Sequence, residues 1–519
     1  MSKRPIRLLR SFVTVGGWTM ASRVLGFLRD ICMANVVGAG PLAEAFFVAF
    51  RLPNMFRRFF AEGAFNMAFV PMFTKKLEQD GPEAARRFGT EALSALTAAL
   101  IVLTVIAQLV MPWLILGLAS GYANDGRLDL AVTFSRVIFP YILFISLAAL
   151  FSGVLNSFGR FAAAAAAPVL LNVIWIAALG LIWVLETDIG QTLSWAIFGA
   201  GLAQLGLVWI AARRLGMGFT LRRPRMTPDV RRLIKIGIPA ALAGGVMQIN
   251  LLVGTQVASY FAGAVGWLWY ADRLYQLPLG VVGVAIGVVL LPELTRRFRE
   301  GDSDGTARAM NRAGEFSLIL TIPATVALIF IPGVLVSALF EHGAFTAADT
   351  EKTALALAIY AVGLPAFVLQ KVLQPAFFAR EDTRTPLRYA VVSMIVNVVI
   401  AIGLAPFVGF LSAPLGTSIA GLVNLVLLWR GVRRLDADIA LDDRLTSRAP
   451  RMALAALGMG GVVVGLANAM AVLLPGSEIL GLIVIVLGGM AAYAVLGSLL
   501  SAFSPAEVRQ LMRRKGGSS

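Results

Sequence analysis

The sequence has very little of the chemistry on which most enzymes and metalloproteins depend. Its 519 residues include one cysteine, Cys32, and one histidine, His342. A single cysteine excludes a disulfide within the chain, and these residue counts provide no cluster of ligands for a metal ion. His342 falls in an expected external loop, so no Ser/His/Asp or Cys/His catalytic set can form. Because a Gly-x-x-x-x-Gly-Lys-Ser/Thr loop is also missing, we expect neither an enzyme nor a bound cofactor.

Charged residues are scarce as well. They make up 14% of the chain, against roughly 25% in a soluble domain, while 58% of the residues are hydrophobic and the mean hydropathy is +0.81. The net charge of +16 could indicate a nucleic-acid partner, but the way basic residues alternate along the chain favours membrane topology instead. We therefore expect a polytopic membrane protein that binds no nucleic acid.

Apolar windows of the length needed to cross a bilayer recur along the whole chain. The basic start of the chain leads into a long first window that carries its own arginines, which predicts a retained first helix and not a cleaved signal peptide. About fourteen spans are expected, near residues 12–37, 42–73, 88–118, 130–157, 162–185, 191–212, 234–261, 266–295, 314–340, 353–379, 388–407, 410–430, 451–474 and 478–502.

Basic residues concentrate in every second connection between these windows. The connections after even-numbered spans are rich in arginine and lysine, most of all residues 213–235. Connections after odd-numbered spans carry acidic residues and are nearly free of basic ones, with Arg127 and Lys352 as the exceptions. Lysine and arginine mark cytoplasmic loops, so the alternation predicts an even number of spans with both termini in the cytoplasm.

An internal repeat relates the first six spans to the next six. Ala49–Leu52 in the second span is similar to Ala271–Leu274 in the eighth, and Asn172 in the fifth recurs as Asn397 in the eleventh. Six helices are an even number, so both copies start on the same side of the membrane. We expect an all-α membrane protein with two six-helix lobes in a pseudo-twofold repeat and two extra C-terminal helices.

These patterns predict five parts of the chain. The N-lobe is expected in residues 1–215 and the C-lobe in residues 236–435, joined by a cytoplasmic amphipathic linker in residues 216–235 that is held to anionic lipid. The two extra helices, in residues 436–503, are glycine-rich, which is typical of close helix packing and leaves room for a groove that shelters lipid tails. A basic cytoplasmic tail is expected in residues 504–519.

Charged residues lie inside the first two apolar windows. An arginine at the centre of a spanning helix costs about 2.5–3.5 kcal/mol on insertion scales, so it normally faces a cavity or a partner. Arg23 and Arg29 are roughly 120° apart on a straight helix, and Gly26 between them would let the helix bend so that both reach one water-filled space. In the second window we expect Arg58 and Glu62 to pair.

The charges inside the spans are mainly positive. Besides Arg23, Arg29 and Arg58, the first lobe carries Arg57, against Asp30, Glu44 and Glu62 only, and in the second lobe Arg273 follows Asp272. Several guanidinium groups in one cavity favour an anionic ligand, because arginine offers a bidentate fork to phosphate. An exporter of cationic drugs would instead need carboxylates in its cavity.

Several motifs together resemble the MurJ (MviN) family of the multidrug/oligosaccharidyl-lipid/polysaccharide (MOP) exporter superfamily, over essentially the full chain. The motifs are Ser22–Asp30, Gly38–Gly40, Ala45–Asn54, Arg57–Phe65, Phe139–Leu143, Trp269–Leu274, Lys371–Leu373 and Asp382–Pro386.

The resemblance implies a fourteen-helix flippase of the bacterial inner membrane. It would move lipid II, the undecaprenyl-diphosphate-linked precursor of peptidoglycan, to the outer leaflet by alternating access, with the polyprenyl tail in a groove of the extra helices. The positions of Arg23, Arg29 and Arg273 would hold the diphosphate, together with Arg57. The acidic positions Asp30, Glu44, Glu62 and Asp272 and the basic Arg58 would form gating or structural ion pairs. Gln276 departs from the family pattern, in which an acidic residue is expected.

Other interpretations remain open at this level. A MATE-like multidrug or cation antiporter shares the six-plus-six plan but typically has twelve spans and an acidic cavity, and another lipid-linked oligosaccharide flippase would share the cationic one. A scaffold for cell-wall synthesis proteins would need no buried arginines. We expect membrane lipids and cell-wall synthesis proteins as further partners, and a cycle driven by an ion gradient or by the membrane potential, worth about 2.3 kcal/mol per charge per 100 mV.

Overall fold

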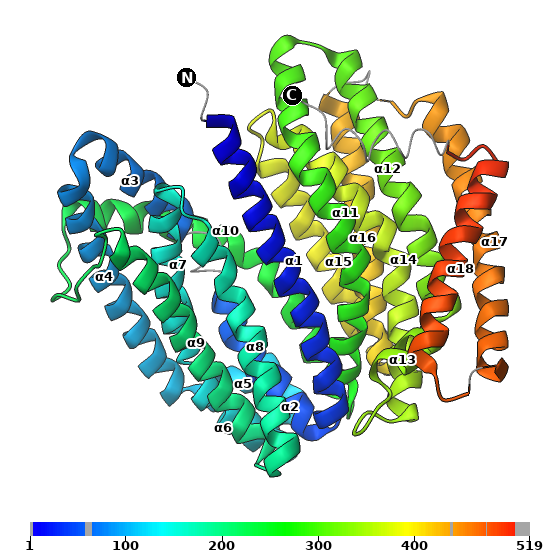
Figure 1. The fold of residues 1–519 in the computed structure, drawn as a ribbon, viewed down its shortest axis with the longest axis horizontal. Coiled ribbons are helices and arrows are strands. Elements are labelled where there is room, and N and C mark those ends of the chain that lie inside the picture. The colour runs from blue at the N-terminus through cyan, green and yellow to red at the C-terminus, as the bar shows by residue number, and fades with distance from the viewer. Residues whose placement is uncertain (1–3, 58–64, 436–439, 474, 504–519) are drawn as a thin grey trace. The chain divides into compact units, whose positions relative to one another are not determined.

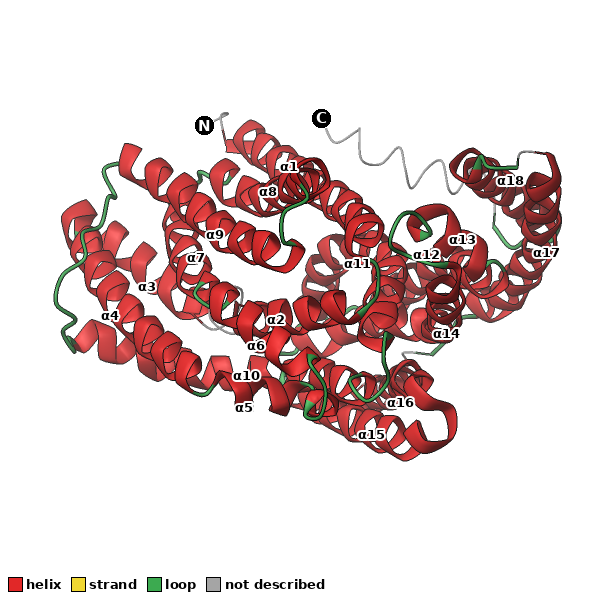
Figure 2. Ribbon diagram, turned by 90° about the horizontal axis from the view of Figure 1, so that it is seen from below, coloured by secondary structure: helices red, strands yellow, loops and turns green. Residues whose placement is uncertain are grey.

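The structure is a computed structural model that describes residues 4–57, 65–435, 440–473 and 475–503. Within these ranges every regular element is a helix, and Figure 2 shows helices joined by loops. The expected all-α class is therefore confirmed.

The chain divides into two compact units, Met1–Gly266 and Trp267–Ser519. Figure 1 colours them from blue to green and from green to red. The helices of the first unit are α1 (Arg4–Val37), α2 (Pro41–Arg57), α3 (Phe65–Gln79), α4 (Gly81–Leu109), α5 (Met111–Leu118), the 3₁₀ helix η2 (Ser120–Tyr122), α6 (Arg127–Ile138), α7 (Tyr141–Ser157), α8 (Ala162–Leu185), α9 (Ile189–Arg214) and α10 (Pro228–Ala258).

The second unit consists of α11, which begins at the end of the first unit, and the helices that follow it. These helices are α11 (Ala264–Glu300), α12 (Ser303–Phe330), α13 (Pro332–Phe340), α14 (Ala347–Phe378), α15 (Arg384–Val408), the 3₁₀ helix η3 (Gly409–Leu411), α16 (Ser412–Leu435), α17 (Asp443–Leu473) and α18 (Glu478–Leu499).

Each of the fourteen apolar windows coincides with at least one of these helices. In the part of the chain that the structure describes, nine helical segments are long and apolar enough to cross a membrane. Two of them contain two helices each: Arg127–Ser157 contains α6 and α7, and Arg384–Leu435 contains α15 and α16. α1 and α2 are not among the nine, and these are the helices that carry the charged residues Arg23, Arg29, Asp30 and Glu44. The protein is thus a multi-pass membrane protein with charged residues in its first two helices.

The repeat is visible in where helices break. The third window is divided between α4 and α5, and the ninth between α12 and α13; a proline, Pro112 or Pro332, stands in the first turn after each break. Proline lacks an N–H, so it suits a first helical turn and does not continue a helix. Related helices also have related neighbours: α9 packs on α7 and α8 as α16 packs on α14 and α15.

The linker and α10 differ from the expected arrangement. The stretch expected as a separate amphipathic helix forms the first turns of α10, which runs without a break from its N-cap residue Thr227 to Ala258. α10 packs on α3, α4 and α5 of the first unit, and its C-terminal end is tied to η2: the amide of Ser120 donates to Gln256 Oε1 (3.1 Å) and that of Gly121 to Ser259 Oγ (3.0 Å). The units therefore divide after α10 and not in the linker before it.

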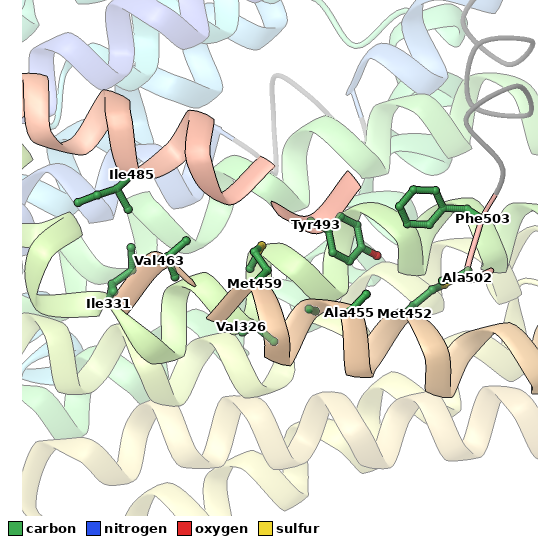
Figure 3. Packing of buried hydrophobic residues seen from close by; sticks show 11 residues of the cluster. Val326, Ile331, Met452, Ala455, Met459, Val463, Ile485, Tyr493, Ala502 and Phe503 are labelled. Atoms are coloured by element: carbon green, nitrogen blue, oxygen red, sulfur yellow. The ribbon is translucent and has the colours of Figure 1, made fainter. Parts of the chain in front are cut away.

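The two extra helices pack on each other and on α12 and α13 through an apolar cluster (Figure 3). Close approach depends on glycine: a Cβ at Gly489 would lie 2.7 Å from Val463 Cγ1, and one at Gly460 would lie 2.9 Å from Val326 Cγ1. The glycines at these positions thus serve packing, as expected. An apolar pocket of about 340 Å³ lies at the start of α17, against α12, α14 and α16, whereas a lipid-tail groove along α17 and α18 stays a prediction.

Candidate functional site

Arg29 is buried in α1 by a set of specific contacts. It is 7% exposed, and its Nε and Nη2 donate to Asp30 Oδ1 at 3.0 and 2.7 Å. Its Nη1 donates to Asn172 Oδ1 of α8 at 3.0 Å, and the guanidinium carbon lies 4.4 Å from the centre of the Trp175 ring. All three guanidinium nitrogens therefore have an acceptor, and the plane of the group is covered by an aromatic ring.

α8 is the helix that positions Arg29, and Figure 1 shows it beside α1. Asn172 is fixed from its other side, because its Nδ2 donates to the Ser22 carbonyl at 3.0 Å. Trp175 meets Phe46 and Phe50 of α2 edge-on, with ring centres 5.4 and 5.0 Å away. The aromatic contacts of α2 thus hold the ring against which Arg29 lies.

Arg23 has a different environment from Arg29. Its side chain is exposed, whereas Arg29 is directed to α8. α1 continues as one α-helix through Gly26, and on a helix the six-residue spacing keeps the two arginines on different faces. A bend at Gly26 stays a prediction. A Cβ at Gly26 would lie 3.6 Å from the Asn172 amide, an ordinary contact distance.

The second span contributes Arg57 at the end of α2. Its side chain is half-buried, and its Nε donates to Asn54 Oδ1 at 3.0 Å, one turn earlier. The expected pair of Arg58 and Glu62 lies outside the described residues. Their roles stay predictions.

Glu44 forms a deeply buried ion pair with Arg127. Its side chain is 0% exposed, and Arg127 of α6 places Nη1 2.9 Å from Glu44 Oε2. The amide of Val265 donates to the other carboxylate oxygen at 3.1 Å, and Arg127 also donates to Asp125 Oδ2 (2.7 Å) and to the Ser259 carbonyl (3.2 Å). Glu44 therefore ties α2 to α6 and to the start of α11.

Two groups beside this pair lie in the connection before α6. Burial, with the Glu44 carboxylate nearby, raises the pKa of the Tyr122 hydroxyl above its ordinary value. The hydrogen bond from Arg127 lowers the pKa of Asp125. Burial therefore dominates at Tyr122, whereas the neighbouring arginine dominates at Asp125.

In the second unit, Arg273 lies on α11 beside Trp269. The guanidinium carbon is 4.5 Å from the centre of the Trp269 ring, one helical turn earlier. Gln276, where the family pattern predicts an acid, donates from Nε2 to Asp272 Oδ2 on the same helix. The neighbour of Asp272 at position 276 is thus a neutral hydrogen-bond donor and not a second carboxylate. Lys371, also singled out in the sequence, is exposed.

Sequence reasoning missed several residues of these clusters. Arg127 appeared only as an exception to the charge pattern, and a lone arginine in an acidic connection was the signal that it has a buried partner. Asn172 was noted as a repeat marker without a role, and Trp175 was not noted. In the second unit, Glu315 of α12 was missed; it is 3% exposed and pairs with Arg444 and Arg448 of α17.

A metal site has no support among the described residues, where no group of three His, Cys, Asp or Glu side chains could hold an ion. The clusters are ion pairs between arginine and carboxylate, supplemented by aromatic rings. The guanidinium groups of these clusters are hydrogen-bond donors, so the clusters are suited to bind an anion.

Comparison with known proteins identifies the fold and the family. A family model described as "Lipid II flippase MurJ" matches residues 33–484. "Probable lipid II flippase MurJ" of Rhizobium meliloti is 47% identical over 466 residues, 88% of this chain and 86% of the relative, and the one of Rhizobium tropici is 42% identical over 98% of this chain and 97% of the relative. The solved structure "Lipid II flippase MurJ, inward closed conformation" aligns with a TM-score of 0.79 and 25% identity over 96% of this chain and 100% of that chain.

A more distant structure places the fold in a wider class. An inward-facing multidrug resistance MATE family transporter of the MOP superfamily aligns with a TM-score of 0.67 at 15% identity, over 82% of this chain and 99% of that chain, which shows a shared fold alone. The all-helical fold is thus that of a multi-pass membrane protein, and this transporter shares it. Within that class, the chain belongs to the lipid II flippase MurJ family.

Proposed function

We propose that this chain is a lipid II flippase, which moves the undecaprenyl-diphosphate-linked precursor of peptidoglycan from the cytoplasmic to the outer leaflet by alternating access. The observation that carries the proposal is the match of the MurJ family model over residues 33–484. Relatives that match nearly the whole chain support it. The ligand is a lipid with an anionic head, which agrees with the excess of arginine in the membrane segments.

The diphosphate is bound by Arg23, Arg29 and Arg57 of the first unit and Arg273 of the second. Arg23 is exposed and available to a ligand. Arg29 already donates to Asp30 and Asn172, so it binds a phosphate oxygen by exchanging one of these acceptors. Since Asp30 and a phosphate compete for the same guanidinium, Asp30 acts as the resting counter-ion of Arg29 and is released when substrate arrives.

The remaining features complete the proposal. The protein works as a transporter without catalytic activity, metal or cofactor, and the membrane potential or an ion gradient drives its cycle. It resides in the bacterial inner membrane with both termini in the cytoplasm, as the basic connections indicate. Besides lipid II it contacts membrane lipids and cell-wall synthesis proteins.

The experiment is to measure the sidedness of lipid II after the protein is depleted and then re-expressed as wild type, Arg23→Ala or Arg29→Ala. We expect lipid II to accumulate in the cytoplasmic leaflet on depletion and only wild type to restore it, with each variant present in the membrane at wild-type amount. Arg434→Ala, an exposed arginine at the end of α16, is the matched control and restores flipping. Normal sidedness after depletion, in a strain without another flippase, would contradict the proposal.

A further inference from the structure

An arginine-lined cavity lies in the first unit between α4 and residues 215–227, which join α9 to α10 and are called the linker from here on. It encloses about 720 Å³. Its arginines are Arg86 and Arg87 on α4 and Arg222, Arg223 and Arg225 on the linker. None of these residues belongs to the proposed lipid II site, and all five are exposed.

The linker is fixed in place at its start. Gly216, with φ +77°, ends α9: its amide donates to the Arg213 carbonyl and that of Met217 to the Ala212 carbonyl, both at 3.0 Å. This pair of bonds is a Schellman motif, which reverses the chain at a defined angle and needs a residue that tolerates positive φ. The next residues therefore leave α9 in one direction, toward α4.

Phe219 then anchors the linker in the core. It is 5% exposed, stacks on Phe151 with ring centres 5.5 Å apart and meets Phe73 edge-on at 6.3 Å. Its ring occupies the space left by the missing side chain of Gly89 on α4. The Phe219 ring thus packs against α3, α4 and α7, and this packing fixes the position of the neighbouring residues.

Two hydrogen bonds fix the far end of the same segment. The amide of Arg222 donates to Ser94 Oγ of α4 at 3.0 Å, and Thr227 Oγ1 donates to Glu91 Oε2 at 2.8 Å. Thr227 is also the N-cap of α10. The backbone that carries Arg222, Arg223 and Arg225 is thus held against α4 at both ends. This side of the cavity therefore has a defined position.

The charge of the cavity is strongly positive. Two carboxylates, Glu83 and Glu91, line it with the five arginines, which leaves three positive charges in excess. Glu91 pairs with Arg87 at 3.5 Å and accepts from Thr227. Among the described residues, no acidic partner is recorded for Arg86, Arg223 or Arg225. Guanidinium groups held together without counter-ions repel one another, and an anion relieves that repulsion.

We infer that this cavity is a binding site for a phosphate-bearing ligand. Arginine binds phosphate through two parallel N–H donors, and five arginines on two walls provide donors for more than one phosphate oxygen at a time. Leu221 and Met226, on the same linker, are 66% and 62% exposed. Apolar side chains exposed beside arginines are typical of segments that lie at a membrane surface, so the favoured source of the phosphate is the headgroup of an anionic lipid.

The test compares two triple variants of the full-length protein that remove equal charge. R222Q/R223Q/R225Q removes the linker wall, and R430Q/R433Q/R434Q removes three exposed arginines of α16 in the second unit. The probe is binding of phosphatidylglycerol to protein in nanodiscs of phosphatidylcholine, counted by native mass spectrometry. We expect the linker variant to lose about tenfold or more in affinity and the α16 variant to stay near wild type. Equal loss in both variants would overturn the inference, because it would indicate general attraction between basic protein and anionic membrane.

A second arm separates the two sources of phosphate. Detergent-solubilised protein is titrated with sodium pyrophosphate and its thermal unfolding is followed. Stabilisation by pyrophosphate that R86Q/R87Q and the linker variant abolish supports a soluble phosphate compound, whereas stabilisation by phosphatidylglycerol alone with the same variant dependence supports the lipid. If neither probe stabilises wild type more than the variants, the cavity binds no phosphate and the inference is wrong. The unfolding transition without ligand shows in the same experiment that each variant is folded.

Discussion

Arg448 of α17 and Glu315 of α12 form an ion pair in which Arg448 Nη1 lies 2.6 Å from Glu315 Oε1. The same carboxylate, 3% exposed, also pairs with Arg444 of α17 at 3.1 Å and with Arg312 of its own helix. Arg312 in turn pairs with Asp442, just before α17. The last two helices are therefore attached to the rest of the second unit at two places: by this cluster at the start of α17, and by the apolar cluster of Figure 3 further along.

Removing the carboxylate should loosen this attachment. Glu315→Ala leaves three neighbouring guanidinium groups without their shared acceptor, and breaking a buried pair in this way typically costs about 3–5 kcal/mol. We expect a value near the lower limit, because the arginines are partly exposed and screened. The measurement is thermal unfolding in detergent with limited proteolysis of the segment before α17. Glu478→Ala, an exposed glutamate at the start of α18, is the control and should change neither.

Asn172 should matter for transport although it carries no charge. Asn172→Ala removes the acceptor of Arg29 Nη1 and the side-chain donor to the Ser22 carbonyl, which keeps its bond within α1. Leaving a buried partner of a charged group unsatisfied costs about 1–3 kcal/mol, so we expect the rate of lipid II flipping to fall about tenfold while the protein remains folded. Val173→Ala, an exposed neighbour on α8, is the control in the same sidedness assay. A full rate in Asn172→Ala would show that the position of Arg29 does not limit transport.

The fold could be predicted to a large extent because its signals are local. Apolar windows and alternating basic connections depend on stretches of about twenty residues, and each window contains a helix. The assignment of α10 was less successful, because it depends on hydrogen bonds that the amides of η2 donate to Gln256 and Ser259, more than 130 residues away. No periodicity in the sequence of α10 itself reports such a contact.

The candidate site was predictable in residue type but not in pairing. Arginines inside apolar windows are conspicuous, so Arg29 and Glu44 were identified as buried charges. Their partners were not: Arg127 pairs with Glu44 across 83 positions, and Asn172 bonds Arg29 across 143. The bend expected at Gly26 stays a prediction, because the helical backbone of α1 continues through this residue and its packing on α8 does not by itself require a bend.

Arg127 should be the more sensitive partner of its cluster. Arg127→Ala leaves Glu44 buried without its cation, which predicts a loss of about 3–5 kcal/mol in the free energy of unfolding. Asp125→Asn should cost much less, because the side chain of Asp125 is 40% exposed and water replaces the lost contact. Thermal or denaturant unfolding of both variants checks the order. Similar values for the two would mean that Glu44 gains little from Arg127.

The Asp125–Arg127 pair should also make stability depend on pH in the acid range. The pKa of Asp125 is lowered in the folded protein, so the pair stabilises it fully above the ordinary value of 3.8 and the contribution is lost as pH falls through the lowered folded value. Unfolding temperatures of wild type and Asp125→Asn should therefore differ near neutral pH and converge only as pH falls from 3.8 through the lowered folded pKa of Asp125. A difference that grows on acidification would have the wrong sign for this pair.

Gly89 should be required for the linker to dock on α4. A Cβ at this position would overlap the ring of Phe219, so Gly89→Ala forces the ring out of its pocket or shifts α4. Overpacking of this kind costs about 1–3 kcal/mol, and we expect both a lower unfolding temperature and faster protease cleavage between Gly218 and Thr227. Gly117→Ala, in α5, is the matched control, because nothing lies within 4 Å of the added Cβ. There the substitution only restricts the unfolded chain, which predicts a change of about 0.4–1 kcal/mol in the stabilising direction. If Gly89→Ala behaves like Gly117→Ala, Phe219 is not the anchor of the linker. The positions of the arginines that follow Phe219 in the chain would then not be fixed by this contact.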